Sequence, residues 1–201
     1  MDKVLILGGT NFIGRNLVEA LLAIDCYDLT LFNRGVTNPE LFPNIKKIIG
    51  NRNTSDLDLV LQNNWDYIID LSCYFPDALS YIGQINTTLK RYIFISTCSV
   101  YDNEENKSVL RNESSPILSC NESQRIDTSV TTYGNRKAEC ERIVQKSGLT
   151  FTIFRPALVY GRYDTSDRFY YWLYNIQKEN SLLIPNGGVN LFSVTYVDDL
   201  V

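Results

Sequence analysis

The sequence predicts an α/β protein built on a doubly wound parallel sheet, with helices covering both faces of the strands. Two observations carry this prediction. Short apolar runs recur along the chain, as expected of strands that are buried on both faces. Segments with helical periodicity separate these runs, and this alternation is typical of parallel sheets. The length of 201 residues is sufficient for one such domain with its own core.

The N-terminal third begins with a strand and a helix. Residues 4–7 are a continuous apolar run, as expected of a buried strand. From residue 12 the apolar spacing becomes helical, because one stripe contains Phe12, Ile13, Leu17, Leu21 and Leu22. Two further strands are expected at residues 29–32 and 45–49, where short apolar runs recur.

The middle of the chain continues the alternation. A short helix is expected over residues 55–63, behind a Thr-Ser cap. A strand is expected at 67–71, and a helix with proline in its first turn is expected over 76–88. The next strand is expected at residues 91–97.

A long polar stretch precedes the last helix and strand. Residues 103–129 hold many Asn, Ser and Glu residues, and we expect them to form a loop of the kind that borders a substrate site. A helix is expected over residues 132–147, ended by Gly148. A strand at 151–154 follows it.

The composition excludes several kinds of chemistry. The chain has no histidine, so neither a histidine-dependent nucleophile nor an imidazole metal site can form. The five cysteines are odd in number and scattered, so no metal site and no disulfide framework is expected. The net charge of −4 disfavours a nucleic acid partner. We find no signal peptide and no apolar run of about 18 residues, so we expect no membrane span and a cytoplasmic protein.

A glycine-rich turn follows the first predicted strand and leads into the first helix. Its residues are Gly8, Gly9, Thr10, Asn11, Phe12, Ile13 and Gly14. Gly8 permits the turn, and Gly14 allows the helix and the strand to pack closely. The helix N-terminus offers free N–H groups and a partial positive charge to a pyrophosphate. This context favours a dinucleotide site over a turn that only reverses the chain.

The end of the second predicted strand helps to choose the dinucleotide. In an NAD site of this type, an acid at this point binds the ribose 2′-hydroxyl. Asn33 and Arg34 stand in its place. A carboxylate would repel a 2′-phosphate whereas Arg34 can pair with it, so NADP is favoured over NAD. Arg15 is a second candidate phosphate partner, although it equally fits a solvated helix position.

Tyr133 and Lys137 are the candidate proton-transfer residues. Their Y-x-x-x-K spacing places both side chains on one helix face. The ammonium, helped by a positively charged nicotinamide, would lower the tyrosine pKa from about 10 and let the phenol exchange a proton with an alcohol. The pattern alone also fits an inert helix pair, since Tyr174 and Lys178 repeat it. Tyr133 is preferred because the preceding strand ends in hydroxyl residues at 96–101.

Taken in order, these motifs resemble the short-chain dehydrogenase/reductase superfamily, on its extended and atypical side, the NAD(P)-dependent epimerase/dehydratase family. The resemblance covers the whole chain and rests on segments 8–14, 95–101, the Tyr133/Lys137 pair, 154–161 and 197–200. It implies a Rossmann-type fold with an NAD(P)-binding domain over residues 1–160. Residues 161–201 would then begin a substrate-binding region whose C-terminal part is truncated.

The resemblance also assigns site residues. Thr97 would hold the substrate hydroxyl, Tyr133 would move the proton, and Lys137 would tune Tyr133 and hold the nicotinamide ribose. The central riboses and the nicotinamide side of the cofactor would be lined by Leu71, Ser72, Arg155 and Pro156. The chain departs from the family pattern at Asn11, which replaces the middle glycine of the turn. It departs again where Asn51-Arg52 replaces the acid that touches adenine.

The sequence therefore predicts an NAD(P)-dependent oxidoreductase or isomerase that oxidises and re-reduces a carbinol, as epimerases and dehydratases do. The expected partner is a small molecule of a sugar or nucleotide-sugar type, bound near 103–129 and 164–174, with a homodimer left open. Residues 164–172 offer an arginine and several aromatic rings, or alternatively form a capped helix with a buried aromatic stripe. A non-catalytic NADP(H)-binding sensor or RNA-associated protein and a simple ketone reductase are the alternatives.

Overall fold

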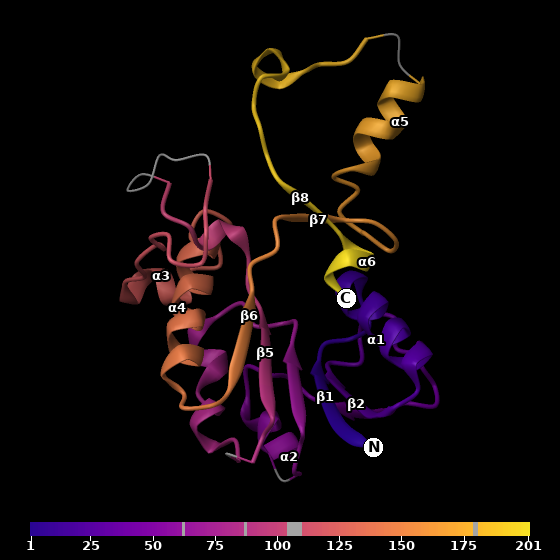
Figure 1. The fold of residues 1–201 in the computed structure, drawn as a ribbon, viewed down its shortest axis with the longest axis vertical. Helices are drawn as coiled ribbons and strands as arrows, with labels where there is room; N and C mark the ends of the chain where they lie inside the picture. The colour runs from indigo at the N-terminus through magenta and orange to yellow at the C-terminus, as the bar shows by residue number, and fades with distance from the viewer. Residues whose placement is uncertain (62, 87, 104–109, 179–180) are drawn as a thin grey trace.

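The computed structural model describes residues 1–61, 63–86, 88–103, 110–178 and 181–201. Its main body is a parallel sheet of six strands in the order β3-β2-β1-β4-β5-β6 (Figure 1). The strands are β1 (Asp2–Leu7), β2 (Tyr27–Asn33), β3 (Lys46–Ile49), β4 (Tyr67–Asp70), β5 (Arg91–Ile95) and β6 (Phe151–Phe154). The strand order reverses between β1 and β4, as in Rossmann-type doubly wound sheets. The predicted fold class is confirmed.

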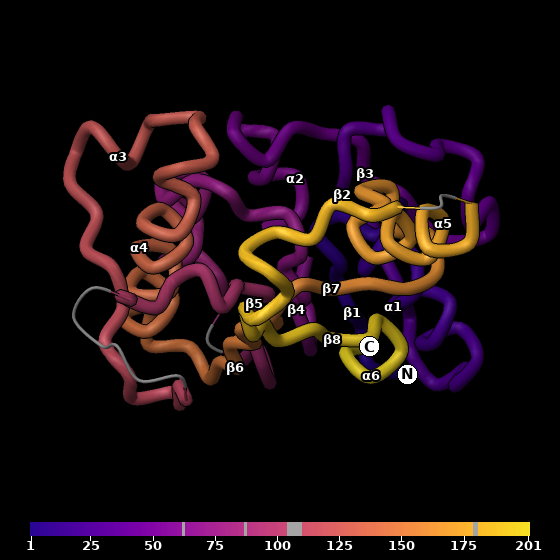
Figure 2. The backbone as a smooth tube through the Cα atoms, turned by 90° about the horizontal axis from the view of Figure 1, so that it is seen from above, coloured from indigo at the N-terminus to yellow at the C-terminus, as the bar shows by residue number. Residues whose placement is uncertain are grey.

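Helices cover both faces of this sheet, which explains why its strands are continuously apolar. In β1, Val4 and Ile6 pack on one face with residues of α1 (Phe12–Ile24). Leu5 and Leu7 pack on the other face with residues of α4 (Tyr133–Lys146). Figure 2 shows the two helices on opposite sides of the sheet. The strand therefore needs an apolar residue at every position.

The predicted helix over 55–63 is present in a shorter form. A 3₁₀ turn at Ser55–Leu57 leads into α2 (Asp58–Leu61). The Thr54 hydroxyl accepts a hydrogen bond from the Asp56 N–H, so the predicted cap is formed. Residue 62 lies outside the described residues.

The predicted helix over 76–88 is wrong. The chain forms two 3₁₀ turns instead, at Pro76–Leu79 and Ile82–Gln84, and residue 87 lies outside the described residues. In an α-helix the Ala78 carbonyl would bond to the N–H four residues later, but here it accepts a hydrogen bond from Arg52 Nη2 at 3.3 Å.

The predicted loop over 103–129 contains one short helix, α3 (Glu122–Ile126). Asn121 and Gln124 form a reciprocal capping box at its start. This Asn-x-x-Gln signal is present in the sequence and marks a helix start. Residues 104–109 lie outside the described residues.

The C-terminal part leaves the sheet and forms a separate layer beyond the carboxyl ends of the strands (Figure 1). Here β7 (Leu158–Tyr160) pairs in parallel with β8 (Val194–Tyr196), and α5 (Tyr170–Lys178) and α6 (Val197–Leu200) complete the layer. Asn16 of α1 anchors it, because the Asn16 amide donates to the Arg162 carbonyl at 3.0 Å.

Helix α5 is present, but the alternative of a buried aromatic stripe is wrong. Tyr170, Tyr171 and Tyr174 are 60%, 55% and 47% exposed, and no described residue of α5 is buried. Its aromatic rings are therefore available on the surface of the C-terminal layer. Among the helices of the described residues, none combines the length and the apolar character that crossing a bilayer would require.

Candidate active site

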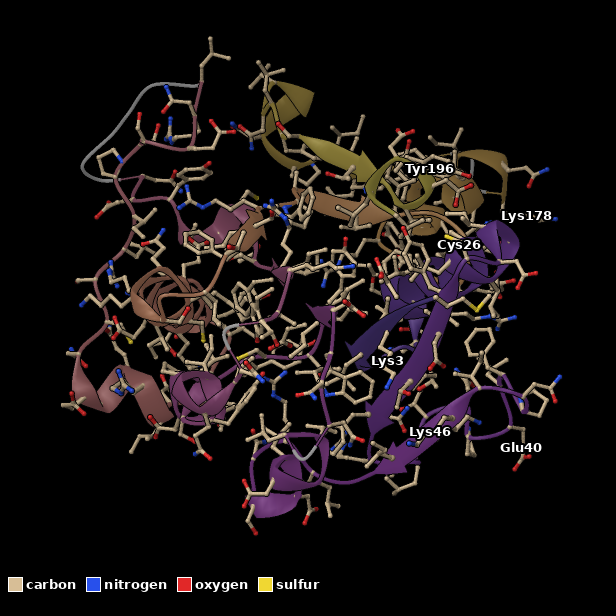
Figure 3. The ribbon with its side chains drawn as sticks, turned by 60° about the horizontal axis from the view of Figure 1, so that its bottom comes forward. Lys3, Cys26, Glu40, Lys46, Lys178 and Tyr196 are labelled. Atoms are coloured by element: carbon tan, nitrogen blue, oxygen red, sulfur yellow. The ribbon has the colours of Figure 1, made fainter. Side chains whose placement is uncertain are left out.

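A cavity of about 530 Å³ lies at the carboxyl ends of the central strands. Four loops and the end of β5 line it, and Lys3 and Lys46 mark the opposite, amino ends of β1 and β3 in Figure 3. The lining comprises residues 8–14, 32–37, 50–53, Leu71, Ser72, Tyr74, Phe75 and Ile95. Ligands of doubly wound sheets bind in this position, next to the reversal of strand order.

The glycine-rich turn forms one wall of the cavity in the predicted way. Gly8 and Gly9 have φ angles of 120° and 97°, which residues with side chains rarely adopt. A Cβ on Gly14 would lie 2.8 Å from the Cα of Gly9, so only glycine allows this approach of helix and turn. Asn11 precedes α1 without a side-chain hydrogen bond to the helix. The first N–H groups of α1 are therefore left for a ligand, and this cradle fits a pyrophosphate.

Asn33 and Arg34 differ in what they do at the end of β2. The Asn33 amide donates to the Gly8 carbonyl at 3.3 Å, and its oxygen accepts from the Gly35 N–H at 2.8 Å. An ionised aspartate could not make the first of these bonds. Arg34 lines the cavity, is exposed, and forms no ion pair or hydrogen bond with another described residue. Its guanidinium is free to meet an anion.

Arg15 is engaged elsewhere. Its Nε donates to a Glu19 carboxylate oxygen at 2.9 Å, and its guanidinium lies 3.5 Å from the centre of the Tyr163 ring. Arg15 is not among the residues that line the cavity in the described part of the chain. These contacts join α1 to the C-terminal layer.

Arg52 lies in the cavity wall beside Asn51, but its charge is committed to the protein interior. Nη1 and Nη2 donate to the two carboxylate oxygens of Asp70 at 2.5 and 2.9 Å. Nη1 also donates to the Ser72 hydroxyl at 3.1 Å. Burial alone would raise the Asp70 pKa, but Arg52 and the Tyr92 hydroxyl outweigh it, and the pKa lies below its usual range. The ion pair thus fixes the Ser72 turn against the cavity.

Thr97 and Tyr133 are brought together, although 36 positions separate them. Thr97 follows β5 and caps a 3₁₀ turn at Cys98–Val100, and Tyr133 begins α4. The Thr97 side chain lies close enough to the Tyr133 phenol to lower its pKa, and the Tyr133 ring centroid lies 6.3 Å from that of the cavity residue Tyr74. Burial, followed by the neighbouring Tyr74, raises the Tyr133 pKa to about 12. The expected lowering is therefore not supplied by the polypeptide alone.

Lys137 lies one helical turn after Tyr133 and is buried. Its ammonium donates to the carbonyls of Cys73 at 2.9 Å and of Ile95 at 2.8 Å, and it lies 4.1 Å from the centre of the Phe94 ring. Burial lowers the Lys137 pKa. Lys137 is not itself among the described residues that line the cavity, but the Ile95 carbonyl that it contacts belongs to a residue of the cavity wall.

Arg155 and Pro156 are not among the described residues that line the cavity. The Arg155 guanidinium pairs with the fully buried Glu141 carboxylate of α4 at 2.7 Å and lies over the Tyr101 ring. The Pro156 carbonyl accepts a hydrogen bond from the Cys98 N–H at 2.9 Å. Both residues thus hold the segment after β6 against the Thr97 turn.

Three features of the site have no counterpart in the sequence prediction. Asp70 anchors Arg52 and also accepts a hydrogen bond from the Tyr92 hydroxyl at 2.7 Å. Tyr74 and Phe75 line the cavity next to Tyr133. A polar residue at the carboxyl end of a parallel strand is a recognisable signal, and it applies to Asp70.

A second cavity, of about 420 Å³, lies in the C-terminal layer. Its lining comprises Leu158, Ser166, Asp167, Arg168, Phe169, Tyr171, Trp172 and Phe192. Aromatic rings beside one arginine can stack on a planar ring and pair with an anion.

Curated relatives match the chain over almost its whole length. A chloroplast stem-loop binding protein of 41 kDa from Arabidopsis thaliana is 25% identical and is matched over 98% of this chain and 53% of its own length. An N-acetyl-α-D-glucosaminyl-diphospho-undecaprenol 4-epimerase from Escherichia coli O157:H7 is 23% identical and is matched over 100% of this chain and 61% of its own length. The chain thus spans between about half and three fifths of these relatives.

Solved structures share the fold. The UDP-glucuronic acid 4-epimerase of Bacillus cereus in complex with NAD superposes with a TM-score of 0.75 at 22% identity, over 98% of this chain and 70% of that one. The dTDP-glucose 4,6-dehydratase of Bacillus anthracis superposes with a TM-score of 0.71 at 17% identity, over 100% of this chain and 69% of that one. The model of the NAD dependent epimerase/dehydratase family matches residues 77–201, which is more than half of the chain. With the glycine cradle and the Thr97–Tyr133 pair in place, the chain belongs to the NAD dependent epimerase/dehydratase family.

Proposed function

We propose that this chain binds NADP and takes part in the epimerisation or dehydration of a nucleotide sugar through reversible oxidation of a carbinol. The observation that carries the proposal is the proximity of Thr97 to Tyr133, whose ring lies next to Tyr74 of the cavity wall. A bound nicotinamide would supply a hydride acceptor and donor. Thr97 would hold the substrate hydroxyl, Tyr133 would accept and return its proton, and Lys137 would hold the adjoining ribose.

The cofactor preference rests on Arg34, which lines the cavity without a partner among the described residues. An arginine at this position can pair with the 2′-phosphate of NADP. We expect Arg34→Ala to weaken NADPH binding about tenfold and to leave NADH binding within twofold, measured by fluorescence titration. Arg15→Ala is the matched control, because the Arg15 guanidinium is held by Glu19 and Tyr163. Equal NADPH and NADH affinities in the unaltered protein would contradict the preference.

The substrate class rests on the relatives and on the second cavity. Structures similar to this chain include epimerases in complex with UDP-glucuronic acid and UDP-glucose. Arg168 and the rings of Phe169 and Trp172 suit the anionic and planar parts of such molecules. We therefore propose residues 1–160 as the cofactor-binding domain and 161–201 as the beginning of the substrate-binding region.

Tyr133→Phe tests the proposed chemistry. The change removes the phenol oxygen and keeps the ring, so it should abolish turnover and leave NADPH affinity unchanged. Conversion of UDP-glucuronic acid, UDP-glucose and UDP-N-acetylglucosamine is measured by chromatography of the sugar nucleotides. Tyr174→Phe in the second Y-x-x-x-K pattern is the matched control and should keep full activity. Turnover by the Tyr133→Phe variant would refute the assignment.

A second candidate function is suggested by the stem-loop binding relative, namely a non-catalytic NADP(H)-binding protein that associates with RNA. The net charge of −4 weighs against it, because phosphate backbones select basic surfaces. Tight NADPH binding without turnover, together with salt-sensitive retention of an RNA hairpin, would favour this function over the enzymatic one.

A further inference from the structure

Arg136 is a buried arginine that has no carboxylate partner. It is 4% exposed and forms no ion pair within the described part of the chain. Buried guanidinium groups are normally paired, because an uncompensated buried charge is costly. Two other arginines with largely buried side chains follow this rule, since Arg52 pairs with Asp70 and Arg155 with Glu141. The exception at Arg136 therefore needs a reason.

The Arg136 guanidinium bonds to neutral oxygens of two segments beside Tyr133. Nε donates to the Tyr74 carbonyl at 3.3 Å, in the loop that lines the main cavity. Nη1 and Nη2 each donate to the Ser129 carbonyl at 3.2 Å, and Nη1 also bonds to the Asp127 carbonyl. The segment from Asp127 leads directly into α4 and Tyr133. One side chain thus ties the cavity loop to the start of the helix.

The start of α4 is adapted to this arrangement. Thr132 occupies the N-cap position but makes no capping hydrogen bond to the helix. Its hydroxyl accepts from Arg136 Nη1 at 2.6 Å and donates to the Asp127 carboxylate at 2.9 Å. The charge of Arg136 therefore meets an acid only through an intervening hydroxyl. The Asp127 carboxylate is held by Thr132 and Ser129 and forms no direct ion pair with the guanidinium, although the charge of Arg136 contributes to lowering the Asp127 pKa.

The groups that face the Tyr133 phenol come from three elements. Tyr74 belongs to the loop after β4, Thr97 to the segment after β5, and Arg136 and Cys140 to α4. Burial, Tyr74 and Cys140 raise the Tyr133 pKa, whereas the Thr97 hydrogen bond and the charge of Arg136 lower it. Lys137 directs two N–H donors to backbone carbonyls. Arg136 is thus a positive charge of the polypeptide that lowers the pKa of the phenol.

We propose that Arg136 is a positioning residue for proton transfer, which fixes Tyr133 against the cavity loop and keeps a positive charge on the same helix as the phenol. The proposal rests on the proposed function of Tyr133. It gives a reason for the carbonyl and hydroxyl partners of this buried arginine: a carboxylate in direct contact with the guanidinium would weaken the field that the phenol experiences.

The charge is tested first by a titration that needs no substrate. A fluorinated tyrosine, whose phenol ionises at lower pH than tyrosine, is incorporated at position 133 of the holoenzyme and titrated by ¹⁹F NMR. Arg136→Gln should raise the midpoint by about one pH unit, and Arg136→Lys should leave it unchanged. Arg125→Gln is the matched control, because Arg125 is also in the α3–α4 region but pairs with Asp77 and Glu139. An unchanged midpoint in a folded Arg136→Gln variant would overturn the role of the charge.

The positioning is tested by the pH dependence of UDP-glucuronic acid conversion. In Arg136→Gln, the pH at which kcat increases should be about one unit higher than in the unaltered protein. Near neutral pH, kcat should fall about tenfold, with KM within twofold. Arg136→Lys should keep the pH profile but recover only part of kcat, because an ammonium cannot reproduce the planar fork to Tyr74 and Ser129. Full recovery of kcat by Arg136→Lys would overturn the positioning role, and this holds even if Arg136→Gln does not fold. If the unaltered enzyme converts none of the sugar nucleotides, the proposed function fails while the NMR titration still decides the role of Arg136.

Discussion

The buried Asp70–Arg52 pair supplies a prediction about the stability of the cofactor site. Asp70 is completely buried at the end of β4 and accepts four hydrogen bonds: two from Arg52, one from the Ser72 N–H at 3.1 Å and one from the Tyr92 hydroxyl at 2.7 Å. Asp70→Asn keeps the shape of the side chain and removes its charge. The Arg52 guanidinium, which has little exposed surface, is then left without a counter-charge.

The expected loss of stability in Asp70→Asn follows from the burial of the Asp70–Arg52 pair. Breaking a buried ion pair by removing one partner costs about 3–5 kcal/mol, because the remaining charge stays desolvated. Domains are stable by about 5–15 kcal/mol, so the variant should lose about a fifth or more of its free energy of unfolding. With a urea dependence of about 2 kcal/mol per molar, the unfolding midpoint should fall by roughly 2 M urea.

Urea unfolding followed by circular dichroism measures this change. Asp2→Asn is the matched control, since Asp2 pairs with Lys90 at the surface, where both side chains are well exposed, and its midpoint should not move measurably. Combining Asp70→Asn with Arg52→Met should recover much of the loss, because the unpaired charge is gone. A midpoint shift below about 0.5 M in Asp70→Asn would refute the claim that the pair is closed to water.

The lowered Asp70 pKa also predicts how the stability of the protein changes at acid pH. The Asp70 pKa is lower in the folded protein than in the unfolded chain, where it is about 3.9. The stabilisation by this carboxylate is therefore complete above about pH 4 and is lost as the pH falls through the folded-state pKa. The unaltered protein should lose stability more steeply than Asp70→Asn in this acid range, as seen by thermal unfolding at a series of pH values. Parallel curves would contradict the lowered pKa.

Alanine at Gly134 and alanine at Gly14 should impair turnover and cofactor binding separately. A Cβ on Gly134 would overlap the Ser99 carbonyl, so Gly134→Ala should displace α4 from the Thr97 turn and lower turnover at least tenfold, with NADPH affinity little changed. A Cβ on Gly14 would lie 2.8 Å from Gly9, so Gly14→Ala should weaken NADPH binding more than tenfold in a fluorescence titration. Gly83→Ala is the control for both, because no atom lies within 4 Å of its added Cβ. Loss of function in that variant would contradict the steric reasoning.

The positions of the strands in the main sheet and of helices α1 and α4 follow from local patterns, and these were predicted correctly. Apolar runs for β1 and β2 and helical spacing for α1 are properties of consecutive residues, which a sequence displays directly. The helix expected over 76–88 failed for a non-local reason. Arg52, which is 26 positions away from Ala78, takes the carbonyl that the helix would have used.

In the candidate site too, some features follow from the local sequence and others depend on residues far away in the chain. The glycine-rich turn and the Thr97–Tyr133 pair lie directly after strands or at a helix start, so topology brings them together once the sheet order is known. The directions of the Arg52 and Arg155 side chains depend on which of many carboxylates each one meets. A sequence with 19 basic and 23 acidic residues does not specify those partners locally.

Buried arginines that pair with a carboxylate differ from Arg136 in what they contribute to the site. Asp70 and Glu141 neutralise Arg52 and Arg155 and hold them in the protein interior, so these two residues stabilise the loops of the site without adding a field to it. Arg136 has the same side chain at a similar depth but bonds to carbonyl and hydroxyl oxygens, and its charge lowers the pKa of the Tyr133 phenol. Since the chain has no histidine, the proposed proton transfer near neutral pH would depend on how far such charges bring a tyrosine toward ionisation. The proposed role of Arg136 in this proton transfer would account for burying an arginine without a direct ion pair.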